Sequence, residues 1–199
     1  MKITKIQPAV KTAGRYNIFV DEKYSFSLDE TQLLDQKLKT GFEISPEKLD
    51  ELKGESEFGK SYARALELIL RRPRSIREIN DYARRKKWEI ELRDRVIEKL
   101  SEKGYLDDRK FANFWLKARV SSKPISKRKL NAELSQKGIK REIIDEILVE
   151  YTELDEQDAL AALIKKKQSK YTDEQKLMAY LASQGFSYGA IKEALRNLD

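Results

Sequence analysis

The chain of 199 residues carries 41 lysines and arginines, 34 aspartates and glutamates, and neither histidine nor cysteine. The absence of both residue types excludes disulfides, the common zinc sites, thiol nucleophiles and imidazole bases. With 40% hydrophobic and 38% charged residues, the composition favours a folded, helix-rich protein over a disordered one. No apolar stretch predicts a membrane span and the N-terminus lacks a signal-peptide core, so we expect a cytoplasmic protein.

The net charge of +7 is unevenly distributed along the chain. Residues 60–141, here called the basic middle, hold 25 basic and 11 acidic residues, a net charge of +14. The segments before and after it are mildly acidic, with net charges of −2 and −5. A concentrated positive field suggests a polyanion or an acidic protein surface as partner, although a solvated helical surface is the alternative.

The N-terminal segment predicts β-structure. In "RYNIFVDEKYSFSL" (residues 15–28) apolar and polar residues alternate on both sides of Asp21-Glu22-Lys23, which predicts a β-hairpin. The turn lacks glycine, which leaves its type open. The preceding "MKITKIQ" predicts a third strand.

Two helices are expected next, one carrying Leu34 and Leu38 and one capped by Ser45 with Pro46 at its first position. Residues 53–59, acidic and flanked by glycines, predict a linker. The overlapping "GESEFGKS" (residues 54–61) matches the phosphate-loop pattern literally, but no buried strand precedes it. Glu55 and Glu57 would repel phosphate, so an ATP-using enzyme is the weakest of the functional hypotheses.

From residue 60 onward the sequence repeats. Three segments align: "SIREINDYARRKKW" from Ser75, "SKRKLNAELSQKGI" from Ser126 and "DEQKLMAYLASQGF" from Asp173. The aligned apolar positions are Ile79, Ala83 and Trp88; Leu130, Leu134 and Ile139; and Leu177, Leu181 and Phe186. Gly138 and Gly185 align where a helix C-cap favours glycine, and Lys87 takes that place in the first copy.

Each aligned segment lies between two further amphipathic helices, which predicts tandem three-helix repeats. The predicted fold is mainly α: three such repeats forming an elongated curved body, with a small N-terminal α+β module that contains the hairpin. The expected domains are the N-terminal module with its linker and then the three repeats: 1–58, 59–108, 109–151 and 152–199. Stacked repeats present long surfaces rather than a deep pocket, which favours binding over catalysis.

Two motifs have a structural and a functional interpretation. In "GYLDD" (residues 104–108) Gly104 is expected at a helix C-cap, Tyr105 and Leu106 in the core, and Asp107 or Asp108 at the next N-cap, rather than a catalytic carboxylate pair. Trp88 and Trp115 fall on apolar positions. We expect them in the core, with base stacking as the alternative.

The basic clusters are the candidates for partner contact. Consecutive cations on one helix spread around it, so not every member can meet one partner. For each single cluster, a solvated face is the alternative. The candidates are Arg71, Arg72 and Arg74; Arg84, Arg85, Lys86 and Lys87; Lys117 and Arg119; and Lys127, Arg128 and Lys129.

At "LRRPRS" (70–75), "EKLSEKGYLDDRKFA" (98–112) and "LNAELSQKGI" (130–139) the sequence resembles the RecX family, regulators of the bacterial RecA recombinase. The N-terminal strands resemble the β-rich module of some Gram-positive members. The stretch "ARVSSKPISK" departs from the family in lacking a glycine before the second repeat's middle helix.

The resemblance implies a non-enzymatic protein, without catalytic, cofactor or metal residues, that binds RecA or its filament. Such a protein lowers the strand-exchange, ATPase and coprotease activities of RecA, and some members bind DNA weakly. A stand-alone helical DNA-binding protein is the rival hypothesis. We expect a monomer that does not bind membranes.

Overall fold

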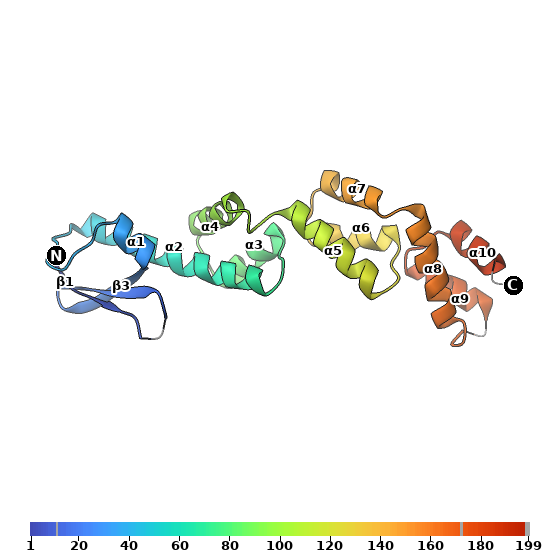
Figure 1. Ribbon diagram of the computed structural model, residues 1–199, viewed down its shortest axis with the longest axis horizontal. Coiled ribbons are helices and arrows are strands. Elements are labelled where there is room, and N and C mark those ends of the chain that lie inside the picture. The colour runs from blue at the N-terminus through green and yellow to red at the C-terminus, as the bar shows by residue number, and fades with distance from the viewer. Residues whose placement is uncertain (11, 172, 198–199) are drawn as a thin grey trace. The chain divides into compact units, whose positions relative to one another are not determined.

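The computed structural model describes residues 1–10, 12–171 and 173–197, and these form three strands and ten helices (Figure 1). The expectation of a mainly helical protein with a small N-terminal sheet is confirmed. The chain divides into two compact units, each of which contains a segment inserted between parts of the other. Unit 1 comprises Met1–Arg72 and Lys87–Tyr105, and unit 2 comprises Pro73–Lys86 and Leu106–Asp199.

Unit 1 begins with a three-stranded antiparallel sheet in the order β1-β2-β3. Its elements are β1 (Ile3–Pro8), β2 (Arg15–Val20), β3 (Lys23–Asp29), α1 (Glu30–Asp35), α2 (Pro46–Arg71) and α4 (Ile90–Glu102). The predicted hairpin and the third strand are therefore confirmed. Asp21 and Glu22 both have positive φ, at 48° and 66°, which is the backbone of a type I′ turn built without glycine.

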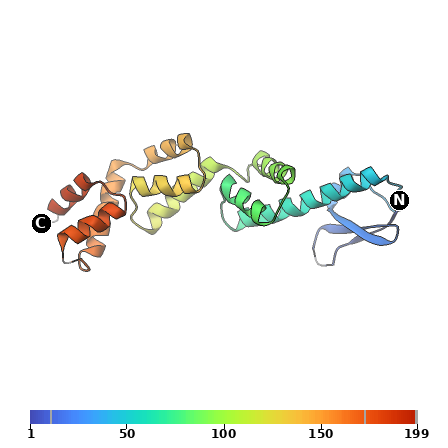
Figure 2. The same cartoon turned by 180° about the vertical axis from the view of Figure 1, so that it is seen from behind.

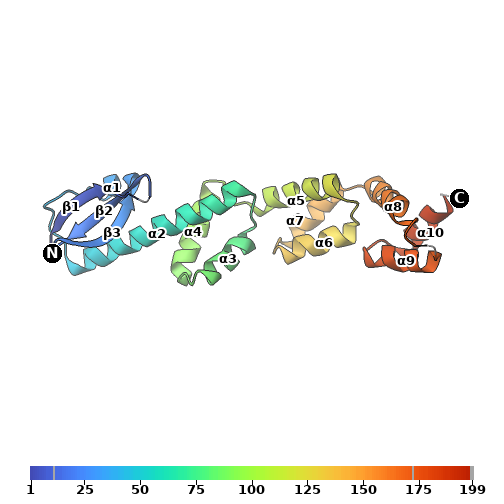
Figure 3. The same ribbon diagram turned by 90° about the horizontal axis from the view of Figure 1, so that it is seen from below.

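The sheet packs against α2, and α4 lies beside the C-terminal half of the same helix (Figures 2 and 3). The N-terminal core gathers apolar side chains from the sheet, the α1–α2 connection and the start of α2: Ile3, Ile18, Val20, Phe26, Leu28, Leu38, Ile44 and Leu52. Further along α2, Arg95 of α4 stacks over the Phe58 ring and pairs with Glu55 at 2.7 Å. These contacts join α4 to α2 beside the place where Ser56 of α2 contacts the sheet.

The helix expected around Leu34 and Leu38 ends earlier than predicted. α1 stops at Asp35, and Lys37 takes a left-handed backbone with φ of 49°. Leu34 is consequently exposed on the short helix, whereas Leu38 is buried in the connection that follows. The cap at Ser45 is confirmed, since its hydroxyl accepts the Lys48 N–H at 3.2 Å with Pro46 at the first helical position.

The prediction of a linker at residues 53–59 is wrong, because α2 runs without a break from Pro46 to Arg71. Two polar contacts hold this stretch against its neighbours: Ser56 Oγ donates to the Ser27 carbonyl at 2.6 Å, and Gln32 Nε2 donates to the Glu55 carbonyl at 2.6 Å. Gly59 lies so close to Gln32 that a Cβ there would be 2.8 Å from its Nε2. Tertiary packing thus overrides the low helix propensity of the two glycines.

Unit 2 contains α3 (Ile76–Arg85), α5 (Asp108–Ser122), α6 (Lys127–Gln136), α7 (Arg141–Glu150), α8 (Glu153–Lys167), α9 (Glu174–Ser183) and α10 (Tyr188–Arg196). α5, α6 and α7 enclose one core, which includes Phe111, Leu130 and Ile144. α8, α9 and α10 enclose another, which includes Leu160, Leu181 and Ile191. The aligned apolar positions in α3, α6 and α9 and in the turns after α6 and α9 are buried, and Trp88 is partly buried.

The turn after each aligned helix contains a left-handed residue at the predicted place. φ is 55° at Lys87, 78° at Gly138 and 96° at Gly185. The predicted capping box of Ser75 and Glu78 is also confirmed. In "GYLDD", Gly104 has φ of 71° and Asp107 caps α5 by accepting the N–H groups of Arg109 and Lys110.

Two hydrogen-bonded joints connect consecutive parts of unit 2. In the first joint, Ser75 Oγ donates to the Lys137 carbonyl at 2.7 Å, and the Ile76 N–H donates to Asp108 at 2.9 Å. In the second joint, Ser126 Oγ donates to the Gln184 carbonyl at 2.8 Å, and the Lys127 N–H donates to Glu156 at 2.8 Å. Ser75 and Ser126 are both fully buried, so each N-cap of an aligned helix is also the link to the turn of the next one.

Candidate functional site

The first basic cluster lies at the end of α2. Arg71 occupies the last turn of the helix and pairs with Glu67 one turn earlier. Arg72 is the C-cap in extended backbone, and Arg74 is partly buried in the connection to α3. Arg72 and Arg74 both have intramolecular partners. The cluster is therefore partly committed to contacts within the chain.

The second cluster occupies the end of α3 and the turn that follows. Arg84, Arg85, Lys86 and Lys87 are all exposed. Arg84 forms a loose ion pair with Asp81 at 3.4 Å, and the Lys86 ammonium lies 5.8 Å from the centre of the Tyr82 ring. Exposed ion pairs of this kind contribute little stability, so Arg84 can exchange its partner at little cost.

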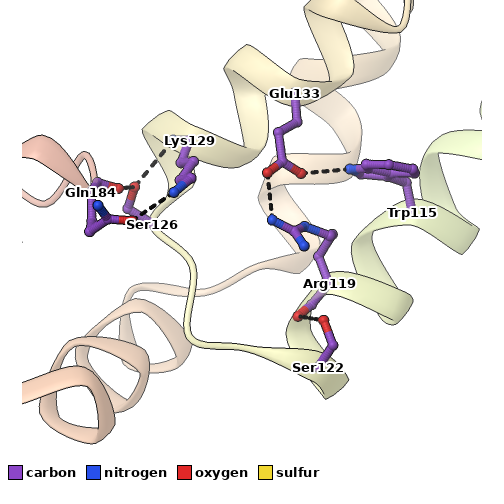
Figure 4. Close-up of polar contacts among 7 residues, drawn as sticks. All are labelled: Trp115, Arg119, Ser122, Ser126, Lys129, Glu133 and Gln184. Atoms are coloured by element: carbon purple, nitrogen blue, oxygen red, sulfur yellow. Dashed lines mark hydrogen bonds and ion pairs between the residues drawn. The ribbon is translucent and has the colours of Figure 1, made fainter. Parts of the chain in front are cut away.

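The third cluster separates into an exposed and an engaged side chain. Lys117 is exposed on α5. Arg119 donates to Glu133 at 2.6 Å, and the same carboxylate accepts the Trp115 indole N–H at 2.9 Å (Figure 4). The Arg119 Nε is buried without a hydrogen-bond partner, which marks this guanidinium as a structural part of the α5–α6 contact.

Trp115 is engaged by three neighbouring side chains. Its ring stacks against Phe111 with the ring centres 5.8 Å apart, and the Lys137 ammonium lies 4.9 Å from its centre. With the indole N–H also bonded to Glu133, the side chain is held within its own repeat. This arrangement favours the core interpretation over base stacking.

The fourth cluster lies in the first turn of α6. Lys129 Nζ donates to Gln184 Oε1 at 2.7 Å (Figure 4). Lys127 is partly buried, and its backbone N–H donates to Glu156. Arg128 is exposed. Five of the candidates are exposed and have side chains without an ion-pair or hydrogen-bond partner in the part of the chain that the structure describes: Arg85, Lys86, Lys87, Lys117 and Arg128.

Two partly buried titratable groups, Asp108 and Tyr151, have shifted pKa values and make structural hydrogen bonds. Asp108 is half-buried, and its desolvation raises the pKa of the carboxyl above the usual value, while the hydrogen bond from Ile76 opposes that shift. Burial raises the pKa of Tyr151 to about 12, and its hydroxyl donates to the Ile125 carbonyl at 2.7 Å. Among the described residues no group of three acidic side chains is arranged to hold a metal ion.

The sequence interpretation partly missed how "GYLDD" is used. Leu106 is buried as expected, but Tyr105 is 47% exposed and does not anchor the turn. Asp107 serves as the N-cap, whereas Asp108 accepts a hydrogen bond from the first residue of α3. The two adjacent carboxylates therefore accept hydrogen bonds from two different helices and are not arranged as an acid–base pair.

The phosphate-loop match is also resolved by geometry. Residues 54–61 lie within α2, where backbone N–H groups are bonded along the helix and do not surround an anion.

Among the described residues, no helix is both long and apolar enough to cross a membrane.

Comparisons with known proteins agree along the whole chain. Family models match at 1–45 (regulatory protein RecX N-terminal domain), 107–148 (RecX, second three-helix domain) and 155–195 (RecX, third three-helix domain). The "Regulatory protein RecX" of Listeria monocytogenes serotype 4b (strain CLIP80459) is 33% identical over 200 residues, which cover 98% of this chain and 74% of the relative.

Two solved structures have a similar fold. A "Crystal structure of regulatory protein RecX" matches with a TM-score of 0.82 at 25% identity and covers 98% of both chains. A structure of RecX from Lactobacillus salivarius matches with a TM-score of 0.64 at 23% identity, over 72% of this chain and 97% of the other. The similarity therefore includes the N-terminal sheet as well as the helical part.

Proposed function

The chain belongs to the RecX family of regulatory proteins, and we propose that it is a negative modulator of a bacterial RecA recombinase. In this proposal it binds RecA or the RecA filament on single-stranded DNA and lowers the ATPase, strand-exchange and coprotease activities. The observation that carries the proposal is the similarity to RecX proteins along the whole chain, in sequence and in fold. It acts as a cytoplasmic monomer, without catalytic activity of its own.

The contact surface is proposed to lie in the basic middle. A filament on DNA presents phosphates, and exposed cations without internal partners lose little when they bind them. Among the described candidates, Arg85, Lys87, Lys117 and Arg128 meet that condition. Arg119 and Lys129 would first have to leave Glu133 and Gln184. Direct contact with single- or double-stranded DNA is expected to be weak beside the contact with the recombinase.

The test is the rate of ATP hydrolysis by RecA on single-stranded DNA during a titration with this protein. A fall in rate at less than one copy per recombinase subunit is expected, because a modulator of filament growth acts on many subunits at once. A parallel reaction without recombinase measures hydrolysis by the chain itself. An unchanged RecA rate at excess protein would refute the proposal.

Charge reversal then tests the surface. The double variant Arg85→Glu/Arg128→Glu is expected to raise the concentration needed for half-inhibition about tenfold or more, since both contacts become repulsive. The matched control is Lys39→Glu/Lys53→Glu, which makes the same change in net charge at exposed positions outside the basic middle. Equal weakening by both doubles would show that net charge alone matters and would remove the assignment of that surface.

The rival function, a stand-alone DNA-binding protein, makes a different prediction. It requires tight, strongly salt-dependent binding to DNA in the absence of recombinase, with a slope set by the number of phosphate contacts. Binding of that kind, together with an unchanged RecA rate, would favour the rival.

A further inference from the structure

Unit 1 contains a groove of about 700 Å³ between the sheet and α2, on the sheet side of the helix. Strands β2 and β3 and the connection before β2 form one side, and Lys60, Ala63 and Arg64 of α2 form the other. This volume is in the range of pockets that hold one small ligand or one unit of a polymer. All residues that line the groove belong to unit 1.

The floor of the groove carries a buried cation. Arg15 is only 8% exposed, and its Nε donates to Ser27 Oγ at 3.2 Å. Its Nη2 donates to the carbonyls of Ser27 and Ser56, so the guanidinium is fixed in place. Among the described residues no group accepts a hydrogen bond from Nη1, and Arg15 is one of the residues that line the groove. Desolvation by burial lowers the pKa of Arg15, and the nearby Asp29 carboxylate opposes that shift.

Two further cations line the side of the groove that α2 forms. Lys60 and Arg64 are one helical turn apart on α2, about 6 Å along its axis. Neither has an ion-pair partner within the described parts of the chain. Among the described residues that line the groove, Glu67 is the acidic one, and it pairs with Arg71. The described lining therefore has three cations and one carboxylate, which is already engaged.

An aromatic ring completes the lining. Tyr24 of β3 is 54% exposed and meets Phe19 edge-on, with the ring centres 6.0 Å apart. A ring that is half-exposed beside cations is the arrangement by which proteins stack bases of single-stranded nucleic acids while they hold the phosphates. An acidic peptide would use the cations but has no need of the exposed ring.

We propose that this groove binds the sugar–phosphate backbone of single-stranded nucleic acid. Arg15 Nη1 and the Lys60 and Arg64 side chains contact phosphate oxygens, and the Tyr24 ring stacks on one base. The site goes beyond the proposed function, because it places a direct nucleic-acid contact at the N-terminal sheet. Its binding is measurable without recombinase, so its failure and the failure of RecA modulation are separate results.

The proposal also gives a role to the lysine of "GESEFGKS". Lys60 contributes to an anion site as a cation on the side of a helix, while the backbone of that segment remains bonded within α2. The sheet on the opposite wall, and not a loop, provides the other groups. The ligand is accordingly expected to be an extended strand rather than a free nucleotide.

The experiment is fluorescence anisotropy of a labelled oligothymidylate titrated with the full chain. The double variant Lys60→Gln/Arg64→Gln is expected to bind about tenfold more weakly and to reduce the salt slope by roughly 1.4, from about 0.7 for each lost phosphate contact. The matched control is Lys39→Gln/Lys53→Gln, two exposed cations of unit 1 that do not line the groove and have no ion pair with a residue of its lining. Oligothymidylate binding of the control is expected to stay within about twofold of the unmodified protein.

A second pair of variants tests the ring. Tyr24→Leu is expected to weaken binding about fivefold or more because base stacking is lost, while Tyr24→Phe retains it. Circular dichroism establishes that each variant is folded. Equal binding by the groove double and its control would overturn the proposal. Preferential binding of polyglutamate over the oligonucleotide, or equally tight binding of ATP, would overturn it as well, in favour of an acidic peptide or a free nucleotide.

Discussion

The two joints of unit 2 share their backbone contacts and differ in the side chains beside them. In both, a buried serine caps an aligned helix and donates to the carbonyl before the next left-handed glycine. Beside the first joint, Glu78 accepts from Lys137 at 2.8 Å. Beside the second, Lys129 donates to Gln184 at 2.7 Å. The same two positions are paired in both copies, with donor and acceptor exchanged.

The comparison teaches which part of a joint is fixed. The serine and the glycine are constrained, because a buried carbonyl needs a donor and a side chain at the glycine would meet the preceding helix. The flanking pair needs only complementary partners, in either direction. An ion pair serves in one joint and a charged–neutral hydrogen bond in the other.

The glycines should give the largest effects when this comparison is broken. Gly138→Ala and Gly185→Ala are each expected to lower the free energy of unfolding by about 2–4 kcal/mol, from left-handed strain and displacement of the neighbour. At Gly138 the new Cβ meets Arg77, 2.6 Å from its Cδ, and at Gly185 it meets the buried Ser126 hydroxyl. Because a buried hydroxyl moves less easily than an arginine chain, Gly185→Ala should cost more. Urea denaturation followed by circular dichroism measures both, and the reverse order would show that the first joint is the more rigid.

Removing the serine hydroxyls comes next in size. Ser75→Ala and Ser126→Ala each remove an N-cap and leave a buried carbonyl without its donor, at an expected cost of about 1.5–3 kcal/mol. Ser187→Ala is the control, since Ser187 caps α10 but its hydroxyl has no bond across a joint in the described structure. It should cost about 1 kcal/mol. If the three variants were equally destabilised, the serines would act as caps alone.

The flanking pairs should respond in opposite directions. Glu78→Gln retains the capping geometry and removes one charge beside Lys137, with an expected loss of about 0.5–1 kcal/mol. Gln184→Glu adds a charge beside Lys129 and should gain about 0.5 kcal/mol. Both changes should shrink in 1 M salt because screening weakens ion pairs. If both variants changed the free energy of unfolding in the same direction, and by amounts that did not depend on salt, the two pairs would not be equivalent.

The smallest effect is expected at Lys87, where the first copy of the repeat has no glycine. Lys87→Gly relieves a left-handed backbone with φ of 55°, but the greater backbone entropy of glycine in the unfolded chain offsets most of that gain. The free energy of unfolding should rise by less than about 0.5 kcal/mol. The control Lys86→Gly, at a right-handed position, should be destabilising. Thermal denaturation of the two variants distinguishes these signs.

Much of the local structure follows from the sequence, because the forces involved act over a few residues. The alternation in "RYNIFVDEKYSFSL", the capping box at Ser75 and the left-handed turns at Gly138 and Gly185 were all predictable in this way. The family followed from short motifs of the same kind. The candidate cations could be named from charge alone, but their availability could not, since Arg119 and Lys129 are engaged by residues on other helices.

What the sequence by itself determined was the type of most elements, the three-fold internal repetition and the position of the basic middle, since periodicity, caps and charge are local properties. Only the tertiary structure decided that residues 53–59 are helical, because Ser27 and Gln32 bind that stretch from the sheet and from α1. It also decided that Ser75 and Ser126 join consecutive repeats, through partners 62 and 58 residues away. Arg15, Tyr24, Lys60 and Arg64 line one groove for the same reason: packing brings together side chains that no local pattern relates.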